Sequence, residues 1–583
     1  MNQIIWLVLR RMRQPLLVLI SVYSIAVLGM VFVPGVEQNG QATHMDFFHA
    51  LYFVSYTSTT IGFGELPVPF SQAQRMWAMV CIYMSVIGWI YSIGAILTLV
   101  QDPAFRQALK ERSFASSVRK IKEPFYLLCG YGEAGSALVH ALTHYNIRII
   151  VIDRSQDRIN ELSLHDQDFP VYVPGLCADA EIPEHLLEAG LKHPCCARLI
   201  ALTDSDSVNL KVAITSKLLN PDLKVTARVS NAETRANIES FGTEDIVDAF
   251  EIFAETIAQA LHSPDQYLLR KFLSGVSHDK FVKPSVPPRG KWIICGYGRF
   301  GQFLVKHLEN ENLPTVVIEA NDQIKPPAHG MIQGRGTEAD TLLDAGVSDA
   351  VGIVAGTDDD SNNLSIIMTA RKLNSELFIV ARQNNVANTV IFKALDADMI
   401  MHPGHVLADH IRGTVVLPKL AEFLDRVSHL DNVWAKELLS KFEETLGTEL
   451  IPDVWVIRIT DESAPAIMEV MTNGLDLRME YLLVDPYNRE VELKAQPLLL
   501  FRDDERQLIP AVSTTLQVND RILFCGVGHA YYRMQVLIKD YYLLQQVVTN
   551  QDIPRSGVLR WVLGYNETKS PESTGSHSVS KEL

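Results

Sequence analysis

Hydrophobic residues are unevenly distributed along this chain of 583 residues, and two long uncharged runs lie near its N-terminus. No charged residue occurs between Arg13 and Glu37, or between Arg75 and Asp102. A helix needs about 20 residues to cross the hydrocarbon core of a bilayer. Both runs reach that length, so the pattern predicts two membrane-spanning helices, at residues 14–36 and 75–101.

Basic residues flank the two predicted spans on one side only. Arg10, Arg11 and Arg13 precede the first span, further Lys and Arg residues follow the second, and the loop between the spans has none. Basic residues are retained on the cytoplasmic side of a membrane. We therefore predict a multi-pass protein of the cell membrane with both termini in the cytoplasm. Residues 1–13 predict a helix that lies in the membrane interface.

A shorter apolar segment, residues 46–60, lies between the spans and is too short to cross a bilayer. It predicts a re-entrant helix. The loop after it reads TTIGFGE, and irregular backbone at membrane depth is tolerated only where it is buried in protein or lines a wet cavity. Gly62 and Gly64 permit dihedrals that point successive carbonyls the same way, and such carbonyls can replace the hydration shell of a cation. The alternative is an ordinary extracellular loop.

The order of span, re-entrant helix, TTIGFG loop and span resembles the pore module of two-transmembrane potassium channels. That family's filter is usually Thr-Val-Gly-Tyr-Gly-Asp, and in this chain Ile, Phe and Glu replace Val, Tyr and Asp. The resemblance implies K⁺ as the permeant ion. It also implies a homotetramer, because a ring needs four filters and one chain carries one. The predicted filter residues are Thr60, Ile61, Gly62, Phe63 and Gly64.

Small residues recur at helical spacing along the second span. This spacing predicts a pore-lining face that consists of Gly88, Ser92, Ala95 and Leu99. Close packing between helices through small residues is the alternative explanation of the same pattern. Gly88 and Gly94 are both candidate gating hinges, and the sequence does not choose between them.

A repeat begins after a charged linker. FYLLCGYGEAGSALVHAL from Phe125 aligns without a gap with KWIICGYGRFGQFLVKHL from Lys291. Each segment predicts a strand, a G-x-G-x-x-G turn and a helix, the arrangement that brings a pyrophosphate to a helix N-terminus. A second strand follows each turn and ends in an acid, Asp153 or Glu319, placed to accept hydrogen bonds from ribose hydroxyls. The repeat therefore predicts two Rossmann-like units with parallel strands.

These units resemble the RCK domain, the regulator of potassium conductance, which also occurs in regulatory subunits of potassium transporters. Residues 334–347 follow the family's pattern at the end of its third strand, with Arg335 in place of an Asp, and residues 175–191 follow it less closely. The resemblance implies a gating ring that binds NAD or an adenine nucleotide, ADP or ATP. Arg299 fits the family's turn, whereas Glu133 in the first turn is unfavourable beside a phosphate if it points inward.

The second unit is therefore the favoured nucleotide site, although either turn could have kept its glycines for geometry alone. The predicted binding residues are Gly296, Tyr297, Gly298, Arg299, Phe300, Gly301, Glu319 and Ala320 in the second unit, and Gly130, Gly132, Gly135, Asp153 and Arg154 in the first.

Acidic clusters follow the fourth strand of each unit. Calcium takes several carboxylate or carbonyl oxygens, and it regulates some RCK-gated channels, so a Ca²⁺ site is one interpretation. Acids that cap the next helix are the other. The candidate ligands are Asp204, Asp206, Asp358 and Asp360.

The predicted fold class is a membrane α-helical pore module followed by two α/β Rossmann-like RCK units and an α+β C-terminal lobe. In that lobe the segments VWVIRITDES, EYLLVDPYN and LQVNDRILFCGV predict strands. The predicted boundaries are an interfacial helix at 1–13, the pore module at 14–101, a linker at 102–123, the first RCK domain at 124–288, the N-lobe of the second at 289–430, the C-terminal lobe at 431–545 and a partly disordered tail at 546–583.

Charge and cysteine content narrow the functional classes. The net charge of −16 argues against non-specific binding of nucleic acid. The seven cysteines form no C-x-x-C pair and indicate reduced thiols. We expect a potassium channel gated by a small nucleotide in a lipid bilayer, with no covalent chemistry. A membrane-tethered NAD-dependent oxidoreductase explains the glycine turns but leaves TTIGFG unexplained. A potassium transporter regulatory subunit is a further alternative, although transporters of that class need several pore repeats.

Overall fold

The computed structural model describes residues 2–38, 41–64, 69–165, 167–243, 245–327 and 330–551. By its internal contacts the chain divides into two compact parts, and the first part comprises Met1–Leu127, Ile150–Arg154 and Pro174–Cys196. The second part comprises Leu128–Ile149, Ser155–Val173 and Ala197–Leu583. Below, the word unit refers only to the two Rossmann-like repeats. Most of the predicted tail at 546–583 lies outside the described residues.

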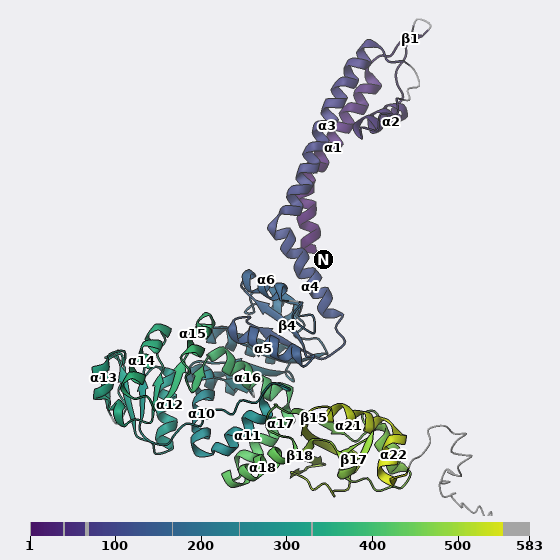
Figure 1. Ribbon diagram of the computed structural model, residues 1–583. Coiled ribbons are helices and arrows are strands. Elements are labelled where there is room, and N and C mark those ends of the chain that lie inside the picture. The colour runs from purple at the N-terminus through teal and green to yellow at the C-terminus, as the bar shows by residue number, and fades with distance from the viewer. Residues whose placement is uncertain are drawn as a thin grey trace, which may run out of the picture. The chain divides into compact units, whose positions relative to one another are not determined.

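Three helices form the predicted pore module, and Figure 1 shows α2 beside the paired helices α1 and α3. Helix α1 is Asn2–Phe32, α2 is Phe47–Ser58 and α3 is Gln72–Gln101. Met12–Phe32 and Gln72–Gln101 are long and apolar enough to cross a membrane. A short hairpin of β1 (Glu37–Gln38) and β2 (Gln41–Ala42) follows α1.

Helix α1 differs from its predicted bounds at both ends. It is continuous across residue 14, with Pro15 inside it, because no glycine separates the basic stretch from the apolar run. It ends at Phe32 rather than at residue 36, since Pro34 and Gly35 follow. The interfacial position of residues 1–13 stays a prediction, but no break in the helix marks it off from the span.

A glycine allows α1 and α3 to pack closely. A Cβ atom at Gly29 would lie 2.0 Å from Cε2 of Trp77, so only glycine fits there. The indole Nε1 of Trp77 donates to the carbonyl of Ala26 at 3.1 Å. Ala50 and Val54 of α2 join the same buried cluster, which therefore ties all three helices together.

The two predicted Rossmann-like units are present as two six-stranded sheets, in the orders β5-β4-β3-β6-β7-β8 and β11-β10-β9-β12-β13-β14. Both orders are those of a Rossmann fold, with the strand before the glycine turn at the centre. The central strand β9 is completely buried, as expected for a parallel strand covered on both faces. The strands of the first sheet are β3 (Phe125–Cys129), β4 (Arg148–Asp153), β5 (Gly175–Cys177), β6 (Cys196–Ala201), β7 (Lys224–Arg228) and β8 (Asp245–Val247). Those of the second are β9 (Trp292–Cys295), β10 (Thr315–Glu319), β11 (Met331–Gln333), β12 (Gly352–Ala355), β13 (Phe378–Arg382) and β14 (Met399–Met401).

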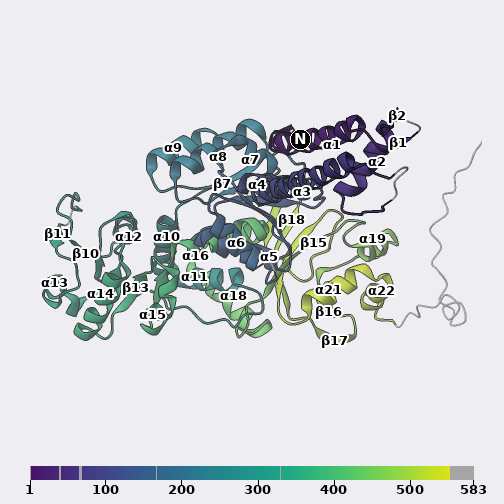
Figure 2. The same cartoon turned by 90° about the horizontal axis from the view of Figure 1, so that it is seen from above.

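Helices connect these strands, and some of them cross between the two units. Helix α10 of the first unit packs on α12 of the second, and α16 of the second packs on α5 of the first (Figures 1 and 2). The helices of the first unit are α5 (Glu133–His144), α6 (Gln156–Leu164), α7 (Pro183–Glu188), α8 (Asp206–Leu219), α9 (Ala232–Ser240), α10 (Ala249–His262) and α11 (Pro264–Ser274), after the linker helix α4 (Pro103–Arg119). Those of the second are α12 (Arg299–Asn310), α13 (Ala339–Asp344), α14 (Asp360–Leu373), α15 (Thr389–Ala394), α16 (Pro403–Val416), α17 (Pro418–Ser428) and α18 (Asn432–Thr445), with 3₁₀ turns at Val347–Asp349 and Val386–Asn388.

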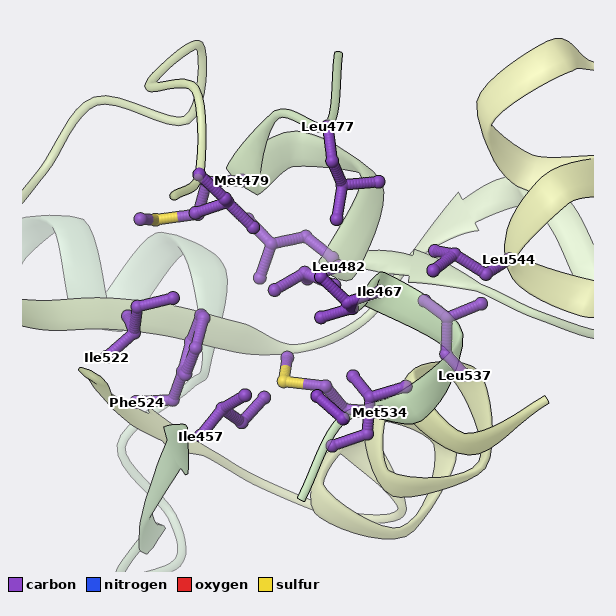
Figure 3. Close-up of a cluster of buried hydrophobic side chains, with 14 of the residues drawn as sticks. Ile457, Ile467, Leu477, Met479, Leu482, Ile522, Phe524, Met534, Leu537 and Leu544 are labelled. Atoms are coloured by element: carbon purple, nitrogen blue, oxygen red, sulfur yellow. The ribbon is translucent and has the colours of Figure 1, made fainter. Parts of the chain in front are cut away.

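The C-terminal lobe is an antiparallel sheet of order β15-β20-β18-β19 with helices beside it. Its core, shown in Figure 3, includes Ile457, Phe524, Met534 and Leu537. The predicted strand EYLLVDPYN is instead the end of a helix and one short strand, because Met479 and Leu482, one helical turn apart, both point into this core. The elements are β15 (Asp453–Arg458), α19 (Pro465–Thr472), α20 (Met479–Leu482), β16 (Val484–Asp485), β17 (Asn488–Glu492), β18 (Ala495–Arg502), β19 (Glu505–Leu508), β20 (Arg521–Gly526), α21 (Ala530–Lys539) and α22 (Tyr541–Thr549).

Candidate functional site

The predicted filter loop begins where helix α2 ends. The backbone N–H groups of Ile61 and Gly62 both donate to the carbonyl of Tyr56, at 3.1 and 3.2 Å. Alternate residues of the loop take positive φ: 62° at Thr60, 61° at Gly62 and 70° at Gly64. This region is costly for a β-branched residue such as Thr60, and strained backbone of this kind clusters at functional sites.

The filter loop makes few contacts with its own chain. Ile61 is 59% exposed and Phe63 69% exposed, and a Cβ atom at Gly62 would meet no atom within 4 Å. The ring of Tyr56 lies edge-on to that of Phe63, with 6.4 Å between their centres. The loop is therefore strained and largely exposed in the single chain. Glu65 lies outside the described residues.

The predicted pore-lining face of α3 is packed within the chain. A Cβ atom at Gly88 would lie 3.5 Å from Val22 of α1, and Ser92 and Leu99 are also buried. Gly88 thus packs against α1 within the chain, as the helix-packing alternative expects, and Ala95 is half-buried on the same face. The pore-lining role of these residues stays a prediction. Gly94, by contrast, is exposed and has no neighbour within 4 Å of a Cβ position.

The second glycine turn has the geometry of a phosphate-binding turn. Gly296 has φ +95°, and a Cβ atom at Gly301 would lie 2.1 Å from the carbonyl oxygen of Gly296, so glycine is required at both positions. Gly298 caps α12, and a Cβ atom there would meet nothing within 4 Å. The backbone at the N-terminus of α12 is therefore open to a ligand, and a helix N-terminus favours an anion.

Glu319 lies at the end of β10 and reaches back to this turn. One carboxylate oxygen accepts the N–H of Tyr297 at 2.6 Å, and the other accepts the N–H of Asn321 at 2.9 Å. A carboxylate has about four lone-pair positions, so two remain for ribose hydroxyls. Ala320 follows, and its carbonyl accepts Nε2 of Gln333 at 2.7 Å.

Two predicted nucleotide ligands of the second turn point elsewhere. Arg299 donates to the carbonyl of Ser230 at 2.6 Å, lies 3.4 Å from Asp248 and stacks on Phe250 at 4.8 Å. Phe300 is completely buried against α10. The resemblance placed Arg299 among the nucleotide-binding residues, but its partners in the structure are the N-cap carboxylate and a first-turn aromatic ring of the crossing helix α10.

The first glycine turn has the same backbone and a different neighbour. Gly130 has φ +103°, and a Cβ atom at Gly135 would lie 2.2 Å from the carbonyl oxygen of Gly130. Glu133 is directed at two groups of the second unit. It accepts the N–H of Val386 at 3.3 Å and lies 3.2 Å from Nε2 of His402.

The other predicted ligands of the first unit lie around the ends of its strands. Asp153 ends β4 and is buried, and Arg154 after it is exposed. Gly132 is less open than Gly298, because a Cβ atom there would lie 3.5 Å from the guanidinium of Arg158.

The acidic clusters are engaged with protein groups. Asp206 accepts the N–H of Ser230 at 2.9 Å, and Asp360 accepts N–H groups from Asn384 and Asn388 at 2.7 Å each. Burial raises the pKa of the Asp360 carboxyl, but hydrogen bonds from Asn388 and Asn384 lower it overall.

The remaining acids also fail to make a metal site. Asp204 pairs with Arg228 at 3.0 Å, Asp359 caps α14, and Asp358 neighbours Arg382. Within the described ranges no group of three or more His, Cys, Asp or Glu residues is arranged to hold a metal ion. The calcium interpretation is therefore not supported, and the capping alternative describes Asp359.

A pair of buried asparagines was missed at the sequence level. Asn363 donates to the carbonyls of Thr357 and Arg382, at 3.0 and 2.8 Å, and thereby joins the ends of β12 and β13. Asn209 makes the same bonds to Thr203 and Arg228 in the first unit. Both lie in the aligned repeats TDSDSVN and TDDDSNN, so their equivalence was the available signal.

Two family models match this chain, one over its N-terminal helices and the other over its two Rossmann-like units. Residues 16–102 match the family described as ion channel, and residues 126–249 and 292–403 match the TrkA-N domain. Probable potassium channel protein 2 of Methanocaldococcus jannaschii is 26% identical over 221 residues, 38% of this chain and 62% of the relative. The voltage-gated potassium channel Kch of Escherichia coli is 23% identical over 217 residues, 37% of this chain and 50% of the relative.

The chain thus spans less than two thirds of the length of these two relatives. The solved structure named GsuK Channel shares 16% identity, covers 94% of this chain and 100% of its own, and has a TM-score of 0.48. The matching segments and the strand orders together confirm the predicted fold class of apolar N-terminal helices followed by two Rossmann-like units. One segment of this chain matches the model of the ion channel family, and two later segments match the model of the TrkA-N domain.

Proposed function

We propose that this chain is the subunit of a potassium channel whose opening is controlled by a nucleotide in the cytoplasm. The observation that carries the proposal is the loop Thr60–Gly64, which has positive φ at every second residue inside a segment that matches the ion channel family. Alternating dihedrals of this kind turn successive carbonyls toward one side, where they can replace the water around K⁺.

Four copies are needed to close such a filter. The exposure of Ile61 and Phe63 in the single chain supports this assembly, because neighbouring copies would cover a strained loop that its own chain leaves open. The proposed particle is a homotetramer with two RCK units per chain, embedded in the cell membrane with both termini in the cytoplasm.

The second glycine turn is the proposed nucleotide site. Gly298 leaves the N-terminus of α12 open, and the Glu319 carboxylate lies over the turn, where it would accept both ribose hydroxyls. A carboxylate in that place favours a free 2′-OH and repels a 2′-phosphate. NAD, ADP and ATP fit this site, and NADP does not.

No covalent step is part of the proposal. A membrane-tethered oxidoreductase would account for the glycine turns but not for the segment that matches the ion channel family. A regulatory subunit of a potassium transporter would likewise have no use for its own filter loop. The nucleotide is therefore proposed as a regulator and not as a hydride donor.

Ion flux into liposomes tests the proposal. Purified protein is expected to pass K⁺ and Rb⁺ far better than Na⁺, and Gly62→Ala, which forces an alanine to φ +61°, is expected to abolish this selectivity. Equal flux of Na⁺ and K⁺ through the unmodified protein would show that the loop is not a potassium filter.

A further inference from the structure

The crossing helix α16 is capped by a histidine that meets the first glycine turn. His402 is the N-cap residue, and its Nδ1 accepts the backbone N–H of His405 at 3.3 Å. The side chain is only 5% exposed. Because Nδ1 is the acceptor, the neutral ring carries its single proton on Nε2.

The opposite edge of the ring faces the first turn. Nε2 lies 3.2 Å from a carboxylate oxygen of Glu133. A Cβ atom at Gly404 would lie 3.0 Å from the backbone nitrogen of Ala134, so the first turns of α16 and α5 are in direct contact. The state of the His402 cap therefore bears directly on the backbone of the first glycine turn.

A second proton on His402 is incompatible with this cap. It must bind Nδ1, which faces an N–H donor, so the capping bond is lost. It also places a cation at the positive end of a helix. Burial is the main cause that lowers the pKa of His402; Glu133 and Asp360 oppose this effect, and His405 adds to it.

We infer that His402 is a proton-sensitive cap, which holds helix α16 against the first glycine turn when neutral and releases it when protonated. The direction of the pH dependence follows from the difference in proton affinity between the two states. The capped ring binds a proton more weakly than a released ring, whose pKa is about 6.5. The contact is thus complete above about pH 6.5 and weakens as the pH falls below that value. This inference concerns the packing of the cytoplasmic units and does not depend on conduction.

Hydrogen exchange of the full-length protein in detergent tests the cap, with rates corrected for the intrinsic effect of pH. Loss of an N-cap lowers helix stability by about 1 kcal/mol, so amides at the start of α16 should exchange about fivefold faster at pH 5.5 than at pH 8. His402→Asn keeps a capping oxygen that does not titrate, and its exchange should be independent of pH. His402→Ala should exchange fast at both pH values.

Two further variants keep the test decisive. His402→Ser provides a second non-titrating cap if the asparagine variant does not assemble. His405→Asn removes the neighbouring imidazole and should retain the pH response of the unmodified protein. The inference is wrong if the unmodified protein shows no pH response, if the response persists in both non-titrating cap variants, or if it disappears with His405.

Discussion

The two glycine turns have nearly the same backbone and different surroundings. In both, a Cβ atom on the third glycine would collide with the carbonyl of the first, at 2.2 Å in one turn and 2.1 Å in the other. In the first turn the crossing helix brings a glycine, Gly404, against the turn, whereas in the second it brings Phe250 against Phe300. The repeated glycines thus give both turns the same geometry, and the side chains around each turn differ: Arg158 lies beside Gly132, and no atom lies beside Gly298.

The charges at the two turns are also reversed. The second turn presents the cation Arg299 to the N-cap carboxylate of Asp248, and the first presents the anion Glu133 to the N-cap imidazole of His402. In each case the residue after the second glycine contacts the cap of a helix from the other unit. The residue after the second glycine is thus a direct contact between the two Rossmann-like units at both turns.

The largest expected effect concerns the second glycine of each turn. Gly298→Ala adds a methyl group where no atom lies within 4 Å, so folding is unaffected, but that methyl group blocks the approach of a phosphate. Nucleotide affinity should fall by about 2–3 kcal/mol, the scale of a hydrogen bond to a charged group. Calorimetry on the full-length protein measures this.

Gly132→Ala is the matched control for that substitution. It should leave nucleotide affinity unchanged, because the second turn is the proposed site. A loss of affinity in Gly132→Ala alone would reverse the assignment of the two turns.

The acids after the second strands give the next largest effect. Glu319→Ala removes the proposed ribose acceptor and should weaken NAD binding by about 1.5–3 kcal/mol. Asp153→Asn, at the equivalent place in the first unit, should leave binding unchanged. Undiminished affinity in Glu319→Ala, measured by calorimetry, would move the site to Gly130–Gly135.

A smaller effect is expected at the Arg299 contact. Arg299 is 44% exposed, so its pairing with Asp248 should contribute about 0.5–1 kcal/mol of stability. A double-mutant cycle of Arg299→Gln and Asp248→Asn, read from thermal unfolding in detergent, measures that coupling. A coupling energy of zero would remove this contact as a link between the units.

The smallest effect is a pH dependence at Asp248. Burial raises the pKa of this carboxyl, and the N–H of Phe250 and the charge of Arg299 partly oppose the shift. A raised carboxyl pKa favours the fold in the protonated form, so this contribution is lost as the pH rises through the folded pKa. Asp248→Asn should flatten the stability curve at acidic pH, and an unchanged curve would contradict the assignment.

Local sequence patterns predicted the helices and strands of this molecule, but they did not predict which side chains from distant parts of the chain contact each other. The signals that could be used were local. They were the uncharged runs, the glycine spacing and the acids at Asp153 and Glu319, and each concerns one helix or strand or two that follow each other along the chain. Glu133 instead meets Val386, 253 residues away along the chain. No periodicity carries information about such a partner, so the contact of Arg299 with Asp248 could not be predicted either.

The pore face shows a different limit. Small residues at helical spacing suit a water-filled pore and a close helix contact equally well, and the sequence holds no signal that separates them. Val22 beside Gly88 shows the close helix contact within the chain, and the pore-lining role stays a prediction. The predicted strand EYLLVDPYN is only partly a strand, with a helix end before Val484–Asp485. Its four consecutive apolar or aromatic residues fit both a strand and a helical turn.

Nucleotide-dependent K⁺ flux tests the central claim most directly. Liposomes that contain the full-length protein should show a K⁺ flux that changes when NAD or ADP is added on the cytoplasmic side. We expect Gly298→Ala to abolish this change and to leave the K⁺ over Na⁺ selectivity intact, since the filter and the turn are separate parts of the chain. A K⁺ flux that responds to nucleotide equally in Gly298→Ala and in the unmodified protein would contradict control of the channel through the second glycine turn.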